Sequence, residues 1–346
     1  MFVDEIKLFN PKLHEPLAPY TTWKIGGPAE ILVEIDSSNN LLGLIKLAIE
    51  HNVPYTVLGK GANVLVSDAG VKGLVIINKS RNIEILDENA DILGISEDEE
   101  NQFNPWIQPR HGESDSDFYT FEDLDYTESG KRVKVKFDSG VDLPYATAWT
   151  LKNNVTGLQF FAGIPSTIGG ALYNNIHGGT KHFSDNFYLA TVIAEGEVKT
   201  FKYEDFNFGY DQSILRENKD IIVLDVILNL YHGDVEKAKF VANEWAKRKR
   251  IQPRQTAGCT FKNIPLDKQK ELGFPTPSVG YIVDKILGWK GKTVGGAMIS
   301  NSHANFIENT GNGKSSEVLQ LINDIKIEVK NKFDLDLETE INLLGF

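Results

Sequence analysis

The sequence has a single cysteine, Cys259, in 346 residues, so an internal disulfide is excluded. No segment approaches the roughly 18 consecutive apolar residues that a membrane-spanning helix needs. Residues 1–17 alternate charged with apolar side chains and lack the apolar core of a secretion signal. We therefore expect a soluble, cytoplasmic protein that has no membrane partner.

Metal-binding motifs are also missing from the sequence. There is no second cysteine and no pair of histidines separated by three residues. The acidic residues lack the 12-residue spacing and central glycine of a calcium-binding loop. The sequence predicts no metal site.

Negative charge is concentrated in one segment. The chain carries 48 acidic and 36 basic side chains, for a net charge of −12. Between Arg81 and Gly130 there are 15 acidic residues and two arginines, and the remaining residues carry a net charge of +1. Because the rest of the protein is electrically balanced, its charge gives no reason to expect a nucleic-acid partner.

The first 78 residues combine strand patterns with one helix pattern. Residues 29–35 and 55–58 are typical of strands, and Leu41–Glu50 has the periodicity of a helix. The glycine-rich turn Gly59–Asn63 leads into another strand, Val64–Val66, and not into a helix. This order excludes a Walker A loop and a dinucleotide-binding Rossmann turn, which both need a helix after the glycines.

The acidic segment lies between two predicted strands. Ile83–Leu86 and Arg132–Phe137 have the pattern of one hairpin, but some 45 residues separate them. Loops longer than about 15 residues are functional or disordered in most proteins. We expect residues 87–130 to form a flexible surface insertion. A docked lid is the alternative, because the segment contains aromatic residues that could be buried, namely Trp106, Phe118, Tyr119, Phe121 and Tyr126.

The rest of the chain also mixes helices and strands. We predict a glycine turn followed by a helix within residues 138–153, helices over residues 234–250 and 279–287, and an amphipathic helix that Ser315 or Ser316 caps. The segment Leu335–Leu344 alternates as a terminal strand. The length predicts two or three domains.

Two glycine clusters, Gly59–Asn63 and Gly163–Gly170, could each offer unhindered backbone amides to an anion. In the second cluster, Ser166 and Thr167 precede a short predicted helix, where hydroxyls and free amides would converge. A pyrophosphate held between the two loops fits this chemistry. Ordinary turns of a β-rich chain are the alternative for either cluster alone.

Cys259 lies in a segment that combines glycine, cysteine, lysine and asparagine, residues 257–263. A lone thiol can be a small buried apolar group, a nucleophile or a proton donor. A nucleophile needs a histidine partner, for which His177, His182 and His303 are available. A proton donor needs no activation, because a thiol with a pKa of about 8.5 is mostly protonated at neutral pH.

Seven motifs in this order resemble the UDP-N-acetylenolpyruvoylglucosamine reductase family, and together they cover nearly the whole chain except the acidic insertion. They are Thr21–Ala29, Val57–Asp68, Gly157–Asn175, Gly258–Asn263, Gly295–Ala297, His303–Ile307 and Leu337–Glu340.

The resemblance implies an α+β fold of the vanillyl-alcohol-oxidase FAD-binding type. Residues 1–78 would form a first FAD-binding subdomain, and residues 79–235 a second one that carries the insertion. Residues 236–346 would form a substrate-binding domain, with the C-terminal strand returning toward the active site. The cofactors implied are FAD and NADPH, and the protein is expected to be a monomer.

The implied reaction is the reduction of the enolpyruvyl ether of UDP-N-acetylglucosamine to UDP-N-acetylmuramate, a step of peptidoglycan precursor synthesis. Hydride comes from flavin N5, and Cys259 occupies the position of the proton donor. Glu340 would help to stabilise the enolate, either protonated or through a bridging donor, since an ionised carboxylate would repel it.

The resemblance also implies binding residues. Those for FAD are Ile25, Gly59, Lys60, Gly61, Ala62, Asn63, Val64, Leu65, Gly163, Ile164, Pro165, Ser166, Thr167, Gly169 and Gly170. Those for the nucleotide-sugar substrate are Tyr210, Lys262, Asn263, His303 and Asn305.

One position departs from the family pattern. The catalytic arginine of the family follows the residue that matches Tyr210, and this chain has Asp211 there. Arg216 could supply the missing charge from a rearranged loop, and we expect it to be catalytic. The alternatives are a flavin oxidoreductase with a different substrate and a non-catalytic protein that binds a nucleotide-sugar or flavin.

The loop Asn175–Asp185 departs from the family as well. We also expect the acidic insertion to point away from the nucleotide site.

Overall fold

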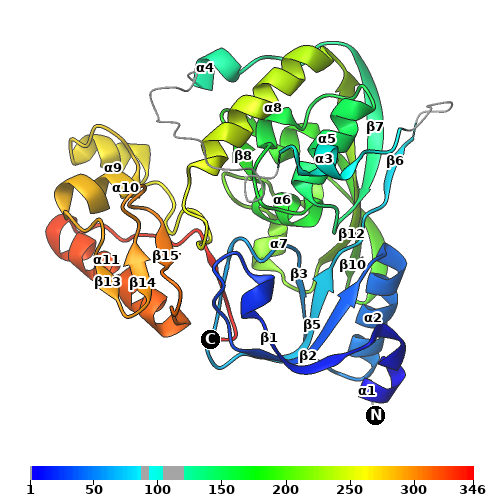
Figure 1. Cartoon of the computed structure of the whole chain (residues 1–346), viewed down its shortest axis with the longest axis horizontal. Helices are drawn as coiled ribbons and strands as arrows, with labels where there is room; N and C mark the ends of the chain where they lie inside the picture. The colour runs from blue at the N-terminus through cyan, green and yellow to red at the C-terminus, as the bar shows by residue number, and fades with distance from the viewer. Residues whose placement is uncertain (1, 87–92, 104–120) are drawn as a thin grey trace. The chain divides into compact units, whose positions relative to one another are not determined.

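The computed structural model describes residues 2–86, 93–103 and 121–346 (Figure 1). The chain divides into two compact units, each described here by itself. Unit 1 comprises Met1–Pro11, Val33–Lys60 and Ile76–Ile251. Unit 2 comprises Lys12–Leu32, Gly61–Val75 and Gln252–Phe346. Helices and sheets are mixed throughout, which confirms the predicted α+β class. The three predicted domains stay predictions.

A four-stranded sheet has the order β1-β2-β5-β3, and the boundary between the units passes through β2 and β5. Its strands are β1 (Lys12–Pro16), β2 (Pro28–Ile35), β3 (Tyr55–Leu58) and β5 (Val71–Asn78). Helix α2 (Ser38–Glu50) follows β2 and begins where the Ser37 hydroxyl accepts a hydrogen bond from the Asn40 amide. The predicted β-α-β beginning is therefore confirmed.

Unit 1 contains a five-stranded antiparallel sheet of order β11-β10-β12-β7-β6. The strands are β6 (Ile83–Ile85), β7 (Lys131–Asp138), β10 (Phe187–Ala194), β11 (Glu197–Lys202) and β12 (Ile222–His232). The register places Ile83 opposite Phe137, so the predicted hairpin on either side of the insertion is confirmed.

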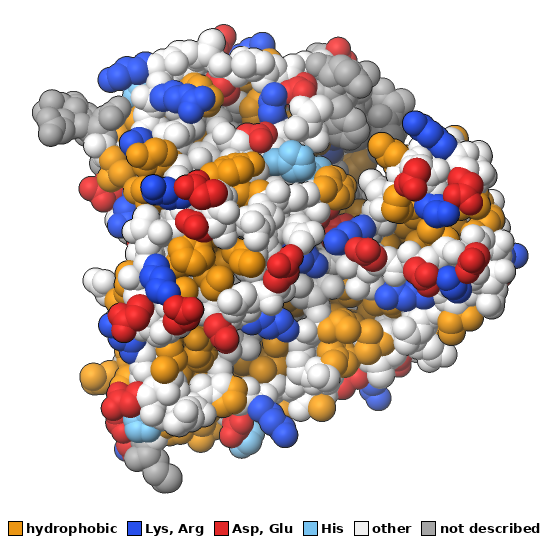
Figure 2. Space-filling model, turned by 180° about the vertical axis from the view of Figure 1, so that it is seen from behind, with side chains coloured by type: hydrophobic (Ala, Val, Ile, Leu, Met, Phe, Trp, Pro, Cys, Tyr) orange, Lys and Arg blue, Asp and Glu red, His pale blue; other side chains and the backbone are white. Residues whose placement is uncertain are grey.

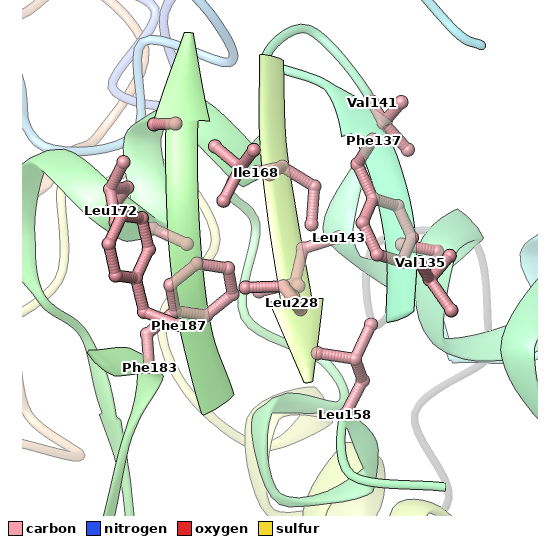
Figure 3. Packing of buried hydrophobic residues seen from close by; sticks show 14 of the residues in the cluster. Val135, Phe137, Val141, Leu143, Leu158, Ile168, Leu172, Phe183, Phe187 and Leu228 are labelled. Atoms are coloured by element: carbon pink, nitrogen blue, oxygen red, sulfur yellow. The ribbon is translucent and has the colours of Figure 1, made fainter. Parts of the chain in front are cut away.

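The main core of unit 1 lies between this sheet and two helices, α5 (Leu143–Lys152) and α6 (Ile168–Asn174). Figure 3 shows Leu228 of β12 in the middle of the core, with Leu172 and Phe183 on one side and Val135 and Phe137 on the other. Full burial of each such side chain contributes roughly 1.5–3 kcal/mol. This core supports the turn that begins α6.

A second apolar cluster of unit 1 lies around α8 (Val235–Arg250) and α5, which Figure 1 shows side by side with α3 (Glu97–Asn101). Asp234 caps α8, since its carboxylate accepts a hydrogen bond from the Lys237 amide. Phe103 and Leu124, from the two ends of the acidic insertion, are 1% exposed in this cluster. The short helix α4 (Phe121–Leu124) carries the second of them.

The described ends of the insertion are therefore docked, and the expectation of a flexible insertion is wrong for them. Tyr126 packs against Phe160, and the Glu128 carboxylate accepts a hydrogen bond from the Thr156 hydroxyl at 2.8 Å. Apolar side chains among the acidic residues cause this docking, because they bury against α5 and α8. Residues 87–92 and 104–120 lie outside the described residues, and Trp106, Phe118 and Tyr119 are among them.

Unit 2 is built around helix α11 (Ser315–Phe333), whose apolar face packs on a three-stranded sheet of order β13-β14-β15. The strands are β13 (Thr293–Val294), β14 (Ala297–Ile299) and β15 (Ile307–Asn309). The remaining helices are α9 (Leu266–Glu271) and α10 (Val279–Tyr281), the latter continued by a π-helical turn (Ile282–Ile286) within the predicted helix 279–287.

The predicted cap of α11 is wrong. Ser315 and Ser316 are the first helical residues, and their amides donate to the Asp68 carboxylate at 2.8 and 3.1 Å. An anionic side chain from a distant part of the chain thus caps the helix and complements its dipole. No local sequence pattern can reveal such a partner.

The predicted terminal strand is also shorter than expected. Only β16 (Asn342–Leu344) is a strand, paired in parallel with β4 (Val64–Val66), while Thr339 forms an isolated bridge with Phe261. The segment changes partner along its length, so Leu335 and Leu337 are buried but Leu343 is 44% exposed. The expected alternation therefore holds only for its first part.

No helix in the part of the chain that the structure describes is long and apolar enough to cross a bilayer. On the face shown in Figure 2, acidic and basic side chains are interspersed.

Candidate functional site

The two glycine clusters approach each other within unit 1. A Cβ atom added at Gly59 would lie 2.6 Å from Oγ1 and 2.8 Å from Cγ2 of Thr167. Next to Gly59, the Lys60 ammonium group lies 2.5 Å from the carboxylate of Asp142, and the main chain of Asp142 forms an isolated antiparallel bridge with that of Thr167. The two loops that sequence reasoning selected thus lie against each other at this point.

The second cluster does not offer the free amides that we expected at the start of α6. The Ile168 amide donates to the Val141 carbonyl and the Gly169 amide donates to the Ser139 carbonyl, both at 2.8 Å. The Gly170 amide donates to the Thr167 hydroxyl at 3.1 Å. The expectation is wrong for these three groups, because the loop uses them to hold the helix start.

The first cluster is better suited to an anion. Among the hydrogen bonds that backbone amides of the described residues donate to backbone carbonyls outside helices and strands, none has its donor in residues 59–62. Gly59 and Ala62 are partly exposed. Gly61 has φ +59°, and a Cβ there would lie 2.4 Å from the Tyr20 carbonyl oxygen, so only glycine fits. This loop fits the diphosphate of a dinucleotide, since main-chain amides are the usual ligands of such groups.

In unit 2, the segment that contains Cys259 pairs with the segment that contains Glu340. The Glu340 amide donates to the Thr260 carbonyl at 2.9 Å, and the Lys262 amide donates to the Glu338 carbonyl at 3.0 Å. These bonds flank the bridge between Phe261 and Thr339. The structure therefore holds the main chain of Glu340 beside that of Thr260, the residue that follows Cys259, and both Cys259 and Glu340 are half-buried.

Asn305 holds this pair of segments. Its side-chain oxygen accepts from the Phe261 amide at 3.1 Å, and its Nδ2 donates to the Phe261 carbonyl at 2.8 Å. The Thr260 amide donates to the Asn305 carbonyl at 2.7 Å. Asn305 is 3% exposed, so its amide group serves the protein itself. His303 precedes it and accepts from the Asn305 amide through Nδ1 at 3.3 Å.

The remaining predicted residues of unit 2 surround these segments. Lys262 forms an ion pair with Glu338 at 3.2 Å, and Asn263 is exposed. Asn63, at the end of the first glycine cluster, donates through Nδ2 to the Glu340 carbonyl at 3.3 Å and accepts from the Asn342 amide at 3.0 Å. Ile25 and Leu65 are buried in the core of unit 2.

Tyr210 and Arg216 belong to unit 1. Arg216 Nη1 donates to the Asn174 side chain at 2.8 Å. Tyr210 is 49% exposed and stacks on His177, with ring centroids 5.1 Å apart. Asp211, which stands where the family has arginine, is buried and lies 3.1 Å from His177 Nδ1.

Sequence reasoning identified Asp211 as a departure but missed its histidine partner. The available indication was a second departure, the loop Asn175–Asp185, which supplies His177. In the described residues, no group of three or more histidine, cysteine or acidic side chains is arranged to hold a metal ion.

Comparisons with known proteins agree with the motifs. Residues 251–344 match the family model "UDP-N-acetylenolpyruvoylglucosamine reductase, C-terminal domain". UDP-N-acetylenolpyruvoylglucosamine reductase 1 of Bacillus cereus is 32% identical over 96% of this chain and 94% of its own length. The enzyme of Clostridium tetani is 31% identical over 97% of this chain and 92% of its own length.

A solved structure extends the likeness to the fold. The UDP-N-acetylenolpyruvylglucosamine reductase of Thermus caldophilus superposes with a TM-score of 0.68 at 27% identity, and the match covers 97% of this chain and 98% of that one. Sequence and fold agree over nearly the whole length, and the chain belongs to the UDP-N-acetylenolpyruvoylglucosamine reductase family.

Proposed function

We propose that the protein reduces the enolpyruvyl ether of UDP-N-acetylglucosamine to UDP-N-acetylmuramate, using FAD and NADPH, in peptidoglycan precursor synthesis. The observation that carries this proposal is the pairing of the Cys259 and Glu340 segments in a chain whose relatives bear the reductase name. We further propose that the enzyme acts as a cytoplasmic monomer.

FAD, when bound, would take hydride from NADPH and deliver it to the vinyl carbon of the substrate. The amides of residues 59–62 would bind its diphosphate. Thr167 lies against Gly59 and would close the other side of this loop. The second cluster, Gly163–Gly170, would contact FAD mainly through van der Waals packing, because three of its amides already donate hydrogen bonds within the protein.

Cys259 would supply the proton that completes the reduction. Hydride addition to the distal vinyl carbon leaves an enolate on the carboxylate side, and the Cys259 S–H donates its proton to the adjacent carbon. The S–H bond breaks, a C–H bond forms, and solvent returns the proton to the thiolate. A half-buried thiol is suited to this role because it needs no activating base.

Glu340 would stabilise the enolate, protonated or through a bridging donor, since its main chain is held beside that of Thr260. Asn305 would act by positioning Thr260 and Phe261. We assign Lys262, Asn263, His303 and Tyr210 to substrate binding. Arg216, which the Asn174 side chain orients, would supply positive charge.

A second candidate is a reductase of the same fold with a different substrate. The buried carboxylate of Asp211 favours it, because negative charge stands where the family carries arginine.

An anaerobic flavin titration tests both candidates. Purified protein should show oxidised-flavin absorbance, NADPH should bleach it, and the enolpyruvyl nucleotide should restore it. Bleaching without restoration by this nucleotide would favour the second candidate. Protein that cannot be loaded with FAD would overturn both.

A further inference from the structure

A turn of unit 1, residues 138–141, holds the start of α6. The Gly169 amide donates to the Ser139 carbonyl, and the Ile168 amide donates to the Val141 carbonyl, both at 2.8 Å. A Cβ atom added at Gly169 would lie 3.0 Å from both the Cβ and the carbonyl oxygen of Ser139, so the two segments are in close contact. The position of the second glycine cluster therefore depends on this turn.

The turn is itself held by side chains at the end of β5. Asn78 Nδ2 donates to the Ser139 hydroxyl at 2.9 Å. The side-chain oxygen of Asn78 accepts from the Ser80 amide at 3.0 Å, and the Ser80 hydroxyl accepts from the Gly140 amide at 3.1 Å. One side-chain amide thus ties the end of β5 to the turn.

These groups are buried. Asn78, Ser80 and Ser139 are 5%, 0% and 4% exposed. Buried polar groups that are hydrogen-bonded to one another rigidify their surroundings, because the loss of one partner leaves another without its bond. A Cβ at Gly140 would lie 2.4 Å from Asn78 Oδ1 and 2.6 Å from the Ser80 amide nitrogen, so only glycine fits against them. The turn is fixed by both hydrogen bonds and close packing.

The contact between the two glycine loops lies one residue beyond these bonds. Thr167 directly precedes Ile168, and it is the residue against which Gly59 packs. A displacement of the turn would pass through the first amides of α6 to Thr167 and change the spacing between the loops. None of the residues Asn78, Ser80 and Ser139 belongs to the seven sequence motifs.

We propose that Asn78 is a positioning residue of the FAD site, which acts through Ser139 and the start of α6 to place the second glycine cluster against Gly59. The inference rests on the proposed binding of FAD at these loops, and it deepens that proposal. Part of the affinity for FAD is then determined by buried hydrogen bonds at the end of β5.

The dissociation constant of FAD provides the test. It is measured on the full-length holoenzyme by dilution, from the fluorescence of the released flavin, while urea denaturation gives the stability of each variant. Asn78→Ala removes the bonds to Ser139 and to the Ser80 amide. We expect it to weaken FAD binding about 10–100-fold, as for the loss of two buried hydrogen bonds that hold the site.

A matched substitution separates positioning from general stability. Asn153 is also a buried asparagine of unit 1, 8% exposed at the end of α5. Its side chain donates to the Trp149 carbonyl at 2.9 Å and exchanges hydrogen bonds with the main chain of Leu93 at 2.7 and 3.0 Å. Asn153→Ala should therefore lower stability as Asn78→Ala does and leave the dissociation constant of FAD unchanged.

A conservative variant provides a rescue. In Asn78→Asp the carboxylate can still accept from the Ser80 amide, and it can accept from the Ser139 hydroxyl, which turns to donate. Burial of the carboxylate should lower stability. Because both contacts remain, FAD binding should be weakened less than in Asn78→Ala.

Ser139→Ala keeps the test decisive if Asn78→Ala does not fold, because it removes one bond of the network and leaves the other. It should weaken FAD binding by a smaller factor. Where both single variants fold, the double variant should bind FAD about as weakly as Asn78→Ala, since the two substitutions remove a shared bond.

The inference is overturned if Asn78→Ala and Ser139→Ala bind FAD as tightly as the wild type. It is also overturned if Asn153→Ala weakens FAD binding as much as Asn78→Ala, or if Asn78→Asp loses as much affinity as Asn78→Ala. Failure of the proposed function would appear separately, as a wild-type enzyme that binds FAD but whose reduced flavin the enolpyruvyl ether does not reoxidise.

Discussion

At the scale of single residues, the thiol of Cys259 offers a direct test of proton donation. Cys259→Ser keeps a protic group at the same position and should retain substantial activity. Cys259→Ala removes it and should slow the protonation step by roughly 10²–10⁴-fold. The turnover rate of UDP-N-acetylmuramate formation, which requires this step, measures the loss, while flavin reduction by NADPH serves as the internal control. An alanine variant as fast as wild type would show that the proton comes from another group.

Asp68 caps α11 and makes part of the stability of unit 2 depend on pH. Desolvation alone would raise the pKa of this carboxyl, but hydrogen bonds from Ser315 and Ser316 outweigh it and lower the pKa below its ordinary value. The ionised carboxylate therefore stabilises the fold at pH values above its ordinary pKa. This contribution is lost as the pH falls through the lowered pKa of the folded state.

Asp68→Ala should accordingly cost about 1 kcal/mol in the free energy of unfolding at neutral pH. The difference from wild type should shrink in acid, below the ordinary pKa of an aspartate. Urea denaturation at several pH values measures it. A difference that does not change with pH would mean that the charge of Asp68 is not what stabilises the helix.

Predictability at this scale depends on whether a residue acts through its neighbours in sequence. Ser37 and Asp234 cap their helices from positions next to the helix start, so the local sequence contains both partners. Asp68 contacts Ser315 and Ser316 from some 247 positions away, and His177 contacts Asp211 across 34 positions. Such partners are created by the fold, so a single sequence can suggest only that the local pattern is unusual.

At the scale of structural elements, the contact between the two glycine loops is sensitive to one methyl group. Gly59→Ala would bring a Cβ within 2.6 Å of Thr167 Oγ1 and force the loops apart. We expect the purified variant to lose most of its FAD. Gly43→Ala is the matched control, because a Cβ there meets nothing within 4 Å, and alanine in helix α2 should stabilise the fold by about 0.5–1 kcal/mol. Flavin absorbance per protein and thermal unfolding measure both effects. A Gly59→Ala variant that retains its full flavin content would show that FAD does not bind at this loop.

The ends of the acidic insertion should contribute to stability. Phe103 is 1% exposed in the cluster formed with α5 and α8, so Phe103→Ala should cost about 3–5 kcal/mol in the free energy of unfolding. Leu93→Ala, in the same insertion but 48% exposed, should cost less than about 0.5 kcal/mol. Urea denaturation measures both variants. Equal small effects would restore the expectation of a flexible insertion.

Elements with strong periodicity were predicted well, and elements with changing partners were not. The helices from Ser38, Val235 and Ser315 follow their apolar faces in the sequence. The segment Leu335–Leu344 also alternates, but it pairs first with the Cys259 segment and then with β4. Periodicity reports which side chains are buried and does not report how often the backbone changes its partner.

At the scale of the whole molecule, unit 2 is assembled from distant parts of the chain, and this determines which fragments can fold. Trp23 is buried in its core, its indole N–H donates to the Ile307 carbonyl at 2.8 Å, and Asn309 Nδ2 donates to the Trp23 carbonyl at 3.0 Å. Ile25 and Leu65 enter the same core, and β4 supplies the partner of β16.

A fragment of residues 251–346 lacks Trp23, Ile25, Leu65 and β4, although it spans the residues that match the C-terminal family model. Without them, the core around α11 would be exposed to water and the Ile307 carbonyl would lose its buried donor. We expect the isolated fragment to lack cooperative thermal unfolding and near-ultraviolet circular dichroism. In the intact chain, Trp23→Phe should preserve the fold but reduce its stability by about 1–3 kcal/mol, because a buried carbonyl loses its partner. A fragment that unfolds cooperatively by itself would mean that α11 and its sheet form an independent domain, to which the N-terminal residues are only attached.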